Sequence, residues 1–182
     1  MRLRRADQHR DDFTDFVAAR GPALHRTAYL LVGERGLAGD LLQEALTKTW
    51  VAWPKLRDTG RAEAWTRKAL HTTAIDWYRR RNWSAERPSD EVPDAPVHAA
   101  QDQVGTREWL WEALLALPPR QRATLVCRFY DDLTEAQTAD VLGCAVGTVK
   151  SQTSAALRTL RGALVEADSD PTLIDALMEA SR

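Results

Sequence analysis

The amino-acid sequence predicts an all-α protein in which an acidic flexible linker joins two small helical domains. Apolar residues recur at intervals of three and four along most of the 182-residue chain, as on the buried face of an amphipathic helix. The pattern stops at residues 84–106, which hold three prolines and five acidic residues, and it resumes at Arg107. A segment of that composition cannot bury a core, so we expect an extended linker there. The chain shows no alternating pattern typical of a β-strand.

Residues 13–83 are predicted to form a first domain of three helices, after a charged tail of residues 1–12. The segment FTDFVAARGPALHRTAYLLV has an inward apolar stripe, and its Gly21-Pro22 pair is a point where the helix kinks or restarts. The segment GLAGDLLQEALTKTWVAWPKL follows, and Pro54 ends or kinks it. The segment DTGRAEAWTRKALHTTAIDWYRRRN starts with a glycine-containing loop and continues as a third helix.

Residues 107–165 are predicted to form a second helical domain, followed by a tail of residues 166–182 with a short helix from Pro171. Pro118-Pro119 separates its first two helices. The stretch VLGCAVGTVKSQ then joins two apolar-periodic segments, and Gly143 accepts the left-handed backbone that ends a helix. This geometry is typical of a helix-turn-helix whose second helix reads DNA. An ordinary helical hairpin with a buried inner face fits the spacing equally well.

Charge is segregated along the chain although the formal net charge is only −1. Residues 61–81 carry six basic and two acidic side chains, and the linker that follows is acidic. Arginines beside aromatic residues favour contact with unstacked single-stranded bases, here through Trp65, Trp77, Tyr78 and Trp83. The alternative for Trp65 and Trp77 is an ordinary place in the core.

The sequence offers no motif for catalysis, metal binding or membrane insertion. It lacks the P-loop, GxSxG and GxGxxG patterns, and its histidines share no metal-ligand spacing (His9, His25, His71 and His98). We therefore expect no enzyme activity, no cofactor and no metal site. Cys127 and Cys144 are expected to be buried free thiols. The charged N-terminus has no apolar signal-peptide run, which favours the cytoplasm.

The second predicted helix has a polar face formed by Asp40, Gln43, Glu44 and Thr47, opposite its leucines. Spacing alone favours a solvated outer surface. A surface that docks a basic partner helix is the alternative.

Three motifs in this order resemble the extracytoplasmic-function (ECF) sigma factors of bacterial RNA polymerase, over roughly Phe13 to Leu164. DLLQEALTKTWVAW is similar to the helix that docks on the β′ clamp helices, and AWTRKALHTTAIDWYRRR to the segment that binds the promoter −10 element. LPPRQRATLVCRFYDDLTEAQTADVLGCAVGTVKSQTSAALRTLR resembles the domain that reads the −35 element. The segments GTVKSQ and RRRNWSAERP most resemble an actinobacterial, SigE-like subgroup of this family.

The resemblance implies a sigma factor that directs core polymerase to promoters and assists −10 melting. Its partners would be core RNA polymerase, through the β′ clamp helices and the β flap, promoter DNA, and an anti-sigma factor. The loop from Asp58 to Ala62 would capture a flipped base. The implied site residues are Asp40, Gln43, Glu44 and Thr47 for core polymerase; Arg61, Lys68, Thr72, Arg79, Arg80 and Arg81 for the −10 element; and Thr148, Lys150, Ser151, Thr153, Ser154 and Arg158 for the −35 element.

The chain departs from the family pattern at several positions. Thr72 stands where the family often has Asn, which alters base discrimination at the −10 element. Ala145 precedes the recognition helix and forgoes a cap worth about 1 kcal/mol. Few arginines follow GTVKS, so we expect weak −35 affinity and strong dependence on polymerase. The alternatives are a stand-alone helix-turn-helix regulator, which would dimerise on palindromic DNA, and an adaptor that never contacts DNA.

Overall fold

The computed structural model describes residues 2–56, 58–85, 111–166, 172 and 174. The helices are α1 (Arg2–Val32), α2 (Arg35–Ala52), α3 (Thr59–Ala85), α5 (Pro119–Leu125), α6 (Glu135–Leu142) and α7 (Val146–Glu166). A 3₁₀ turn, η1 (Trp53–Lys55), follows α2, and a π-helical turn, η2 (Val126–Tyr130), follows α5. Residues 111–116 are also helical, and the described part of the chain contains no strand. The all-α prediction is confirmed, whereas most of the predicted linker lies outside the described residues.

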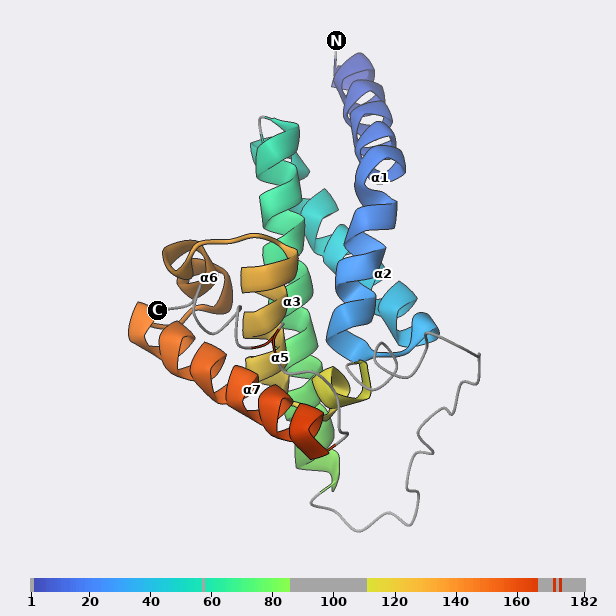
Figure 1. Cartoon of the computed structure of the whole chain (residues 1–182). Coiled ribbons are helices and arrows are strands. Elements are labelled where there is room, and N and C mark those ends of the chain that lie inside the picture. The colour runs from blue at the N-terminus through green and yellow to red at the C-terminus, as the bar shows by residue number, and fades with distance from the viewer. Residues whose placement is uncertain (1, 57, 86–110, 167–171, 173, 175–182) are drawn as a thin grey trace.

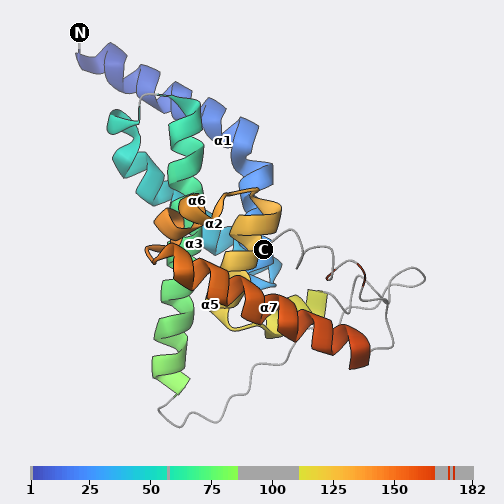
Figure 2. The same ribbon diagram turned by 60° about the vertical axis from the view of Figure 1, so that its left-hand side comes forward.

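Helix α3 occupies the centre of the molecule and packs on both sides (Figures 1 and 2). Helices α1 and α2 contact it on one side, and α5 and α6 contact it on the other. We call α1–α3 the first half and residues 111–166 the second half. None of the described helices is long and apolar enough to cross a membrane.

The helix boundaries of the first half follow from local interactions. Helix α1 continues through Pro22 without interruption, so the predicted restart at Gly21-Pro22 does not occur. Helix α2 begins where the Glu34 carboxylate accepts hydrogen bonds from the backbone N–H groups of Gly36 and Leu37, at 2.6 and 2.8 Å. It ends just before Pro54, as predicted, because the 3₁₀ turn takes over at Trp53.

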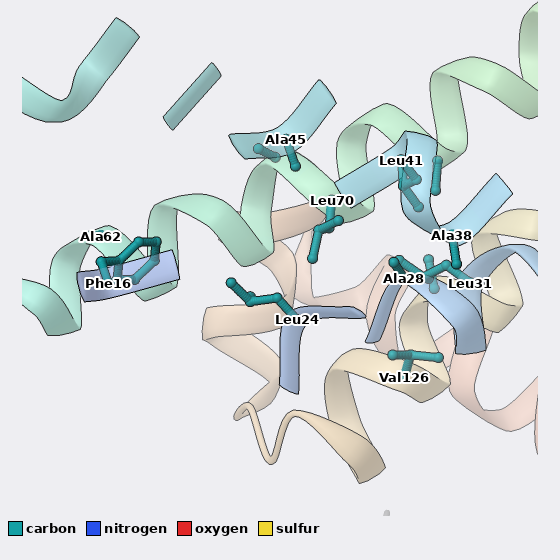
Figure 3. Close-up of a cluster of buried hydrophobic side chains, with 13 residues drawn as sticks. Phe16, Leu24, Ala28, Leu31, Ala38, Leu41, Ala45, Ala62, Leu70 and Val126 are labelled. Atoms are coloured by element: carbon teal, nitrogen blue, oxygen red, sulfur yellow. The ribbon is translucent and has the colours of Figure 1, made fainter. Parts of the chain in front are cut away.

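Two hydrophobic clusters stabilise the fold. The first unites α1, α2 and α3 with two residues of the second half, Ala123 and Val126 (Figure 3). The second cluster joins residues 113–125 to α7 through Leu117, Leu125, Ala156, Leu157 and Leu160, and the C-terminal Ile174 is buried in it. Because Ala123 and Val126 complete the first cluster, the two halves form one packed structure.

The predicted helix-turn-helix is formed by α6 and α7. A capping box starts α6: Thr134 accepts the backbone N–H of Gln137, and the Gln137 side chain accepts the backbone N–H of Thr134. Gly143 ends it in the left-handed conformation, with φ 62° and ψ 43°, as the sequence predicted. Helix α7 begins at Val146 and buries Val149.

Candidate functional site

The polar face of α2 points away from the core of the first half. Asp40, Gln43 and Thr47 are exposed, and the Thr47 hydroxyl donates to the backbone carbonyl of Gln43 at 2.9 Å. Leu41 and Ala45, on the opposite face, are fully buried in the first cluster. The amphipathic pattern of α2 therefore fixes which side chains remain available to a partner.

Glu44 differs from the rest of this face because it is held from within the first half. Its carboxylate accepts the indole N–H of Trp77 at 2.8 Å and pairs with Lys48 at 2.9 Å. The hydrogen bond from Lys48, followed by that from Trp77, lowers the pKa of Glu44 against the opposing effect of burial. Glu44 thus anchors α2 to α3. Trp77 has a structural role, because its ring packs against the first cluster while its N–H is bonded to Glu44, which is the core position that the sequence left open as an alternative.

The residues predicted to bind the −10 element are spread along α3. Arg61 is exposed and pairs with Asp58 at 3.4 Å, and Arg79 and Arg80 are exposed near the other end. The Thr72 hydroxyl donates to the backbone carbonyl of Lys68, at 2.8 Å, so it is satisfied within the helix. The side chain of Arg81 lies outside the described residues.

A groove of about 950 Å³ separates the start of α3 from α6. Arg61, Trp65 and Lys68 line one wall, and Leu133, Ala136, Gln137, Asp140 and Val141 line the other. Lys68 crosses the groove to pair with Asp140 at 3.2 Å. Part of the predicted −10 surface therefore faces the helix-turn-helix of the second half.

The residues predicted to bind the −35 element do not all share one face of α7. Lys150, Ser151, Ser154 and Arg158 are exposed, and Thr148 is half-buried. Thr153 is only 5 % exposed, because it follows Val149 by four residues and joins the inward stripe with Ala156 and Leu157. We therefore exclude Thr153 from the candidate DNA-reading face; the same spacing in the sequence would have identified it as an inward residue.

A buried polar cluster that was not predicted from the sequence lies between the halves, centred on Asp131. Its Oδ2 lies 2.8 Å from His71 Nε2, and its Oδ1 accepts the Thr27 hydroxyl at 3.3 Å and lies 3.7 Å from Arg67 Nε. Cys127 Sγ lies 3.4 Å from the same His71 Nε2. The sequence shows that Cys127 and Asp131 are four residues apart and so lie on one side of a helical turn. Their contact with His71 depends on tertiary packing and has no signal in the sequence. Cys144, the second thiol predicted to be buried, is only half-buried.

The three motifs of the sequence occupy separate surfaces of one helical structure, and comparison with known proteins assigns them to a family. Sigma-70 region 2 matches residues 16–84, and Sigma-70 region 4 matches residues 107–160. The RNA polymerase sigma-E factor of Streptomyces coelicolor is 35% identical over 164 residues, covering 90% of this chain and 92% of that protein. The ECF RNA polymerase sigma factor SigL of Mycobacterium tuberculosis is 33% identical over 147 residues, covering 79% of this chain and 83% of that protein.

A solved structure agrees with these relatives. The sigma factor RpoE of Bartonella quintana, crystallised in complex with the anti-sigma factor NepR, superimposes with a TM-score of 0.68 at 27% identity. The match covers 84% of this chain and 96% of that one. The chain therefore belongs to the sigma-70 family and is an RNA polymerase sigma factor of the extracytoplasmic-function type.

Proposed function

We propose that this sigma factor binds core RNA polymerase through the exposed face of α2 and reads promoter DNA with α3 and α7. The observation that carries the proposal is the α2 face itself. Asp40, Gln43 and Thr47 are exposed while Glu44 is fixed from behind by Trp77 and Lys48, so the acceptors sit on a rigid support. A basic partner helix such as a β′ clamp helix complements that face.

The promoter contacts divide between the two halves. On α3, Arg79 and Arg80 would hold backbone phosphates of the −10 element, while Arg61, Lys68 and Thr72 face the flipped base and its neighbours. On α7, the exposed Lys150, Ser151, Ser154 and Arg158 would contact the −35 major groove, with Thr148 at the edge of that face. Arg81 keeps its predicted role as a phosphate contact.

The packed arrangement of the halves constrains the order of events. Lys68 is paired with Asp140, and the groove between α3 and α6 places one DNA-reading surface against the other half. The −10 surface becomes fully accessible only when the second half moves away from α3. Because the α2 face is exposed without such a movement, polymerase binding would come first and promoter reading second.

We also propose a further protein partner and a cellular location. The resemblance to a sigma factor crystallised with an anti-sigma factor supports an anti-sigma factor as a further partner. We assign the protein to the cytoplasm, where its polymerase partner is located, and give it no catalytic activity of its own.

The test is co-migration of the purified protein with bacterial core polymerase on size exclusion. The Asp40→Ala/Gln43→Ala variant should lose association, whereas Asp15→Ala, an exposed acidic residue of α1, should retain it. We leave Glu44 unchanged, because its loss would disturb the α2–α3 contact as well as the surface. Full association of the double variant would overturn the assignment of this face, and no association of the wild type would overturn the proposal.

A further inference from the structure

Three side chains of metal-binding type meet in the buried interface between α3 and η2. His71 Nε2, Cys127 Sγ and one Asp131 carboxylate oxygen all lie within 4.8 Å of one another. The side chains of His71 and Asp131 are 0% and 1% exposed. His71 belongs to the first half, and Cys127 and Asp131 belong to the second, so the cluster spans the contact between the halves.

Hydrogen bonding satisfies this cluster only in part. Asp131 Oδ2 and Cys127 Sγ both approach the same ring nitrogen, His71 Nε2, at 2.8 and 3.4 Å. A neutral Nε2 offers either one hydrogen or one lone pair, so the carboxylate and the sulfur must share a single hydrogen if both contacts are hydrogen bonds. His71 Nδ1 is buried and makes no hydrogen bond within the described residues.

The same geometry argues against a nucleophilic Cys–His–Asp triad. In such a triad the nucleophile and the carboxylate contact opposite nitrogens of the ring, so that a proton is relayed through it. Here both contact Nε2. Burial, followed by the nearby Asp131 carboxylate, raises the pKa of the Cys127 thiol.

A tetrahedral cation is compatible with the convergence of these three atoms. Zinc bonds of about 2.0–2.3 Å at tetrahedral angles place ligand atoms roughly 3.4–3.6 Å apart. The Nε2–Sγ distance of 3.4 Å is already in that range, and the Nε2–Oδ2 distance of 2.8 Å requires an outward shift of about half an ångström. The π-helical turn η2 helps, because its wide hydrogen bond from Asp131 N to Val126 O places Asp131 beside Cys127.

The contacts around Asp131 hold its carboxylate in a fixed orientation, as is usual for a metal-binding carboxylate. Its second oxygen, Oδ1, accepts the Thr27 hydroxyl at 3.3 Å and faces Arg67 Nε at 3.7 Å, which leaves Oδ2 for His71 and Cys127. Outer contacts of this kind fix metal-binding carboxylates in other proteins. One thiolate and one carboxylate would also balance the charge of a divalent cation.

We propose that His71, Cys127 and Asp131 bind a zinc-class divalent cation that fastens α3 to η2. Thiolate and imidazole select such a cation over magnesium or calcium. Three protein ligands leave a fourth position for an exchangeable ligand, so the ion can be lost and regained. Because the complete ligand set exists only when the halves are packed, binding stabilises the packed state. If the proposed function also holds, the ion keeps the −10 surface covered.

The experiment is a cobalt titration of the full-length, metal-free protein, since Co²⁺ replaces zinc and reports thiolate ligation by a charge-transfer absorption band. The wild type should develop the band with one ion per chain, and zinc should displace it. Cys127→Ser should abolish the band, whereas Cys144→Ser should leave it intact. Asp131→Asn should weaken cobalt binding by about 10- to 100-fold, and Asp132→Asn, at its exposed neighbour, should not.

Three results would overturn the proposal: no thiolate band in the wild type, a band that survives Cys127→Ser, or a band lost in Cys144→Ser alone. Circular dichroism of each variant shows whether a lost absorption band comes from unfolding. His71→Gln then tests a second ligand while the Cys127 thiol is kept. No step of the titration involves polymerase or DNA, so it stands or falls separately from the proposed function.

Discussion

The exposed face of α2 and the predicted DNA-reading surface of α3 belong to the same half of the molecule, yet their accessibility differs. On α2, Asp40, Gln43 and Thr47 are exposed. On α3, Lys68 is paired with Asp140 of the other half, and His71 is fully buried against Asp131. The α2 face is fully available in the packed state, whereas part of the predicted α3 surface faces the second half and its two ends, at Arg61 and at Arg79 and Arg80, remain exposed. Under the proposed function, this difference predicts that polymerase binds before the whole −10 surface is read.

The largest effect should come from removing Asp131. Asp131→Ala removes the buried carboxylate that His71, Thr27 and Arg67 all contact, and leaving buried polar groups without their partner costs about 1–3 kcal/mol. Chemical denaturation should show that loss in the free energy of unfolding, and Asp132→Asn, which keeps a residue suited to the left-handed backbone at that position, should change it far less. An unchanged stability for Asp131→Ala would mean that the cluster does not hold the halves together.

The next effect concerns the part of α3 that is already exposed. Arg79→Ala/Arg80→Ala removes two expected phosphate contacts, so promoter affinity of the polymerase complex should fall about tenfold. The salt dependence should become shallower by roughly 0.7 per arginine if the contacted strand is single. Filter binding across a salt series measures both, with Arg10→Ala on α1 as the control. Unchanged affinity and slope would remove these arginines from the DNA surface.

A smaller effect should distinguish the two partners of the groove-spanning ion pair. Asp140→Ala frees Lys68 and should raise promoter affinity up to about fivefold, because an exposed pair is worth at most about 1 kcal/mol. Lys68→Ala breaks the same pair but also removes the expected DNA contact, so it should lower affinity. If both variants changed affinity in the same direction, the pair would not be covering a DNA-binding residue.

The smallest effect lies at the start of α2. Two backbone N–H groups, those of Leu37 and Gly36, lower the pKa of Glu34. A lowered folded-state pKa gives stability that is present above the unfolded-state value and lost as pH falls through the folded-state value. Glu34→Gln should therefore reduce stability at neutral pH, and its difference from the wild type should shrink in acid. Thermal unfolding at several pH values checks this, and a constant difference would contradict the capping role.

Much of the fold could be predicted from the sequence, because its signals are local. The stop at Pro54, the left-handed Gly143 and the apolar stripes follow from backbone sterics and helical periodicity. The restart at Gly21-Pro22 was not realised, since packing of Leu24 and Ala28 in the first cluster holds α1 continuous across the proline.

The candidate site was only partly predictable, because contacts between distant segments have no sequence signal of their own. The exposed α2 face could be identified from spacing and resemblance. Thr153 was assigned to the DNA face although its spacing from Val149 places it inside. The meeting of His71 with Cys127 and Asp131, and the pairing of Lys68 with Asp140, depend on how the halves pack.

The most direct test of the covered α3 surface uses Cys127, which is fully buried between the halves. In a Cys144→Ser background with a chelator present, the rate of thiol alkylation reports separation of the halves. If the halves separate on promoter binding, labelling should be slow in the free protein and faster by on the order of tenfold or more in the complex with core polymerase and promoter DNA, because an exposed thiol regains its ordinary pKa. Equal rates in the two states would contradict that separation.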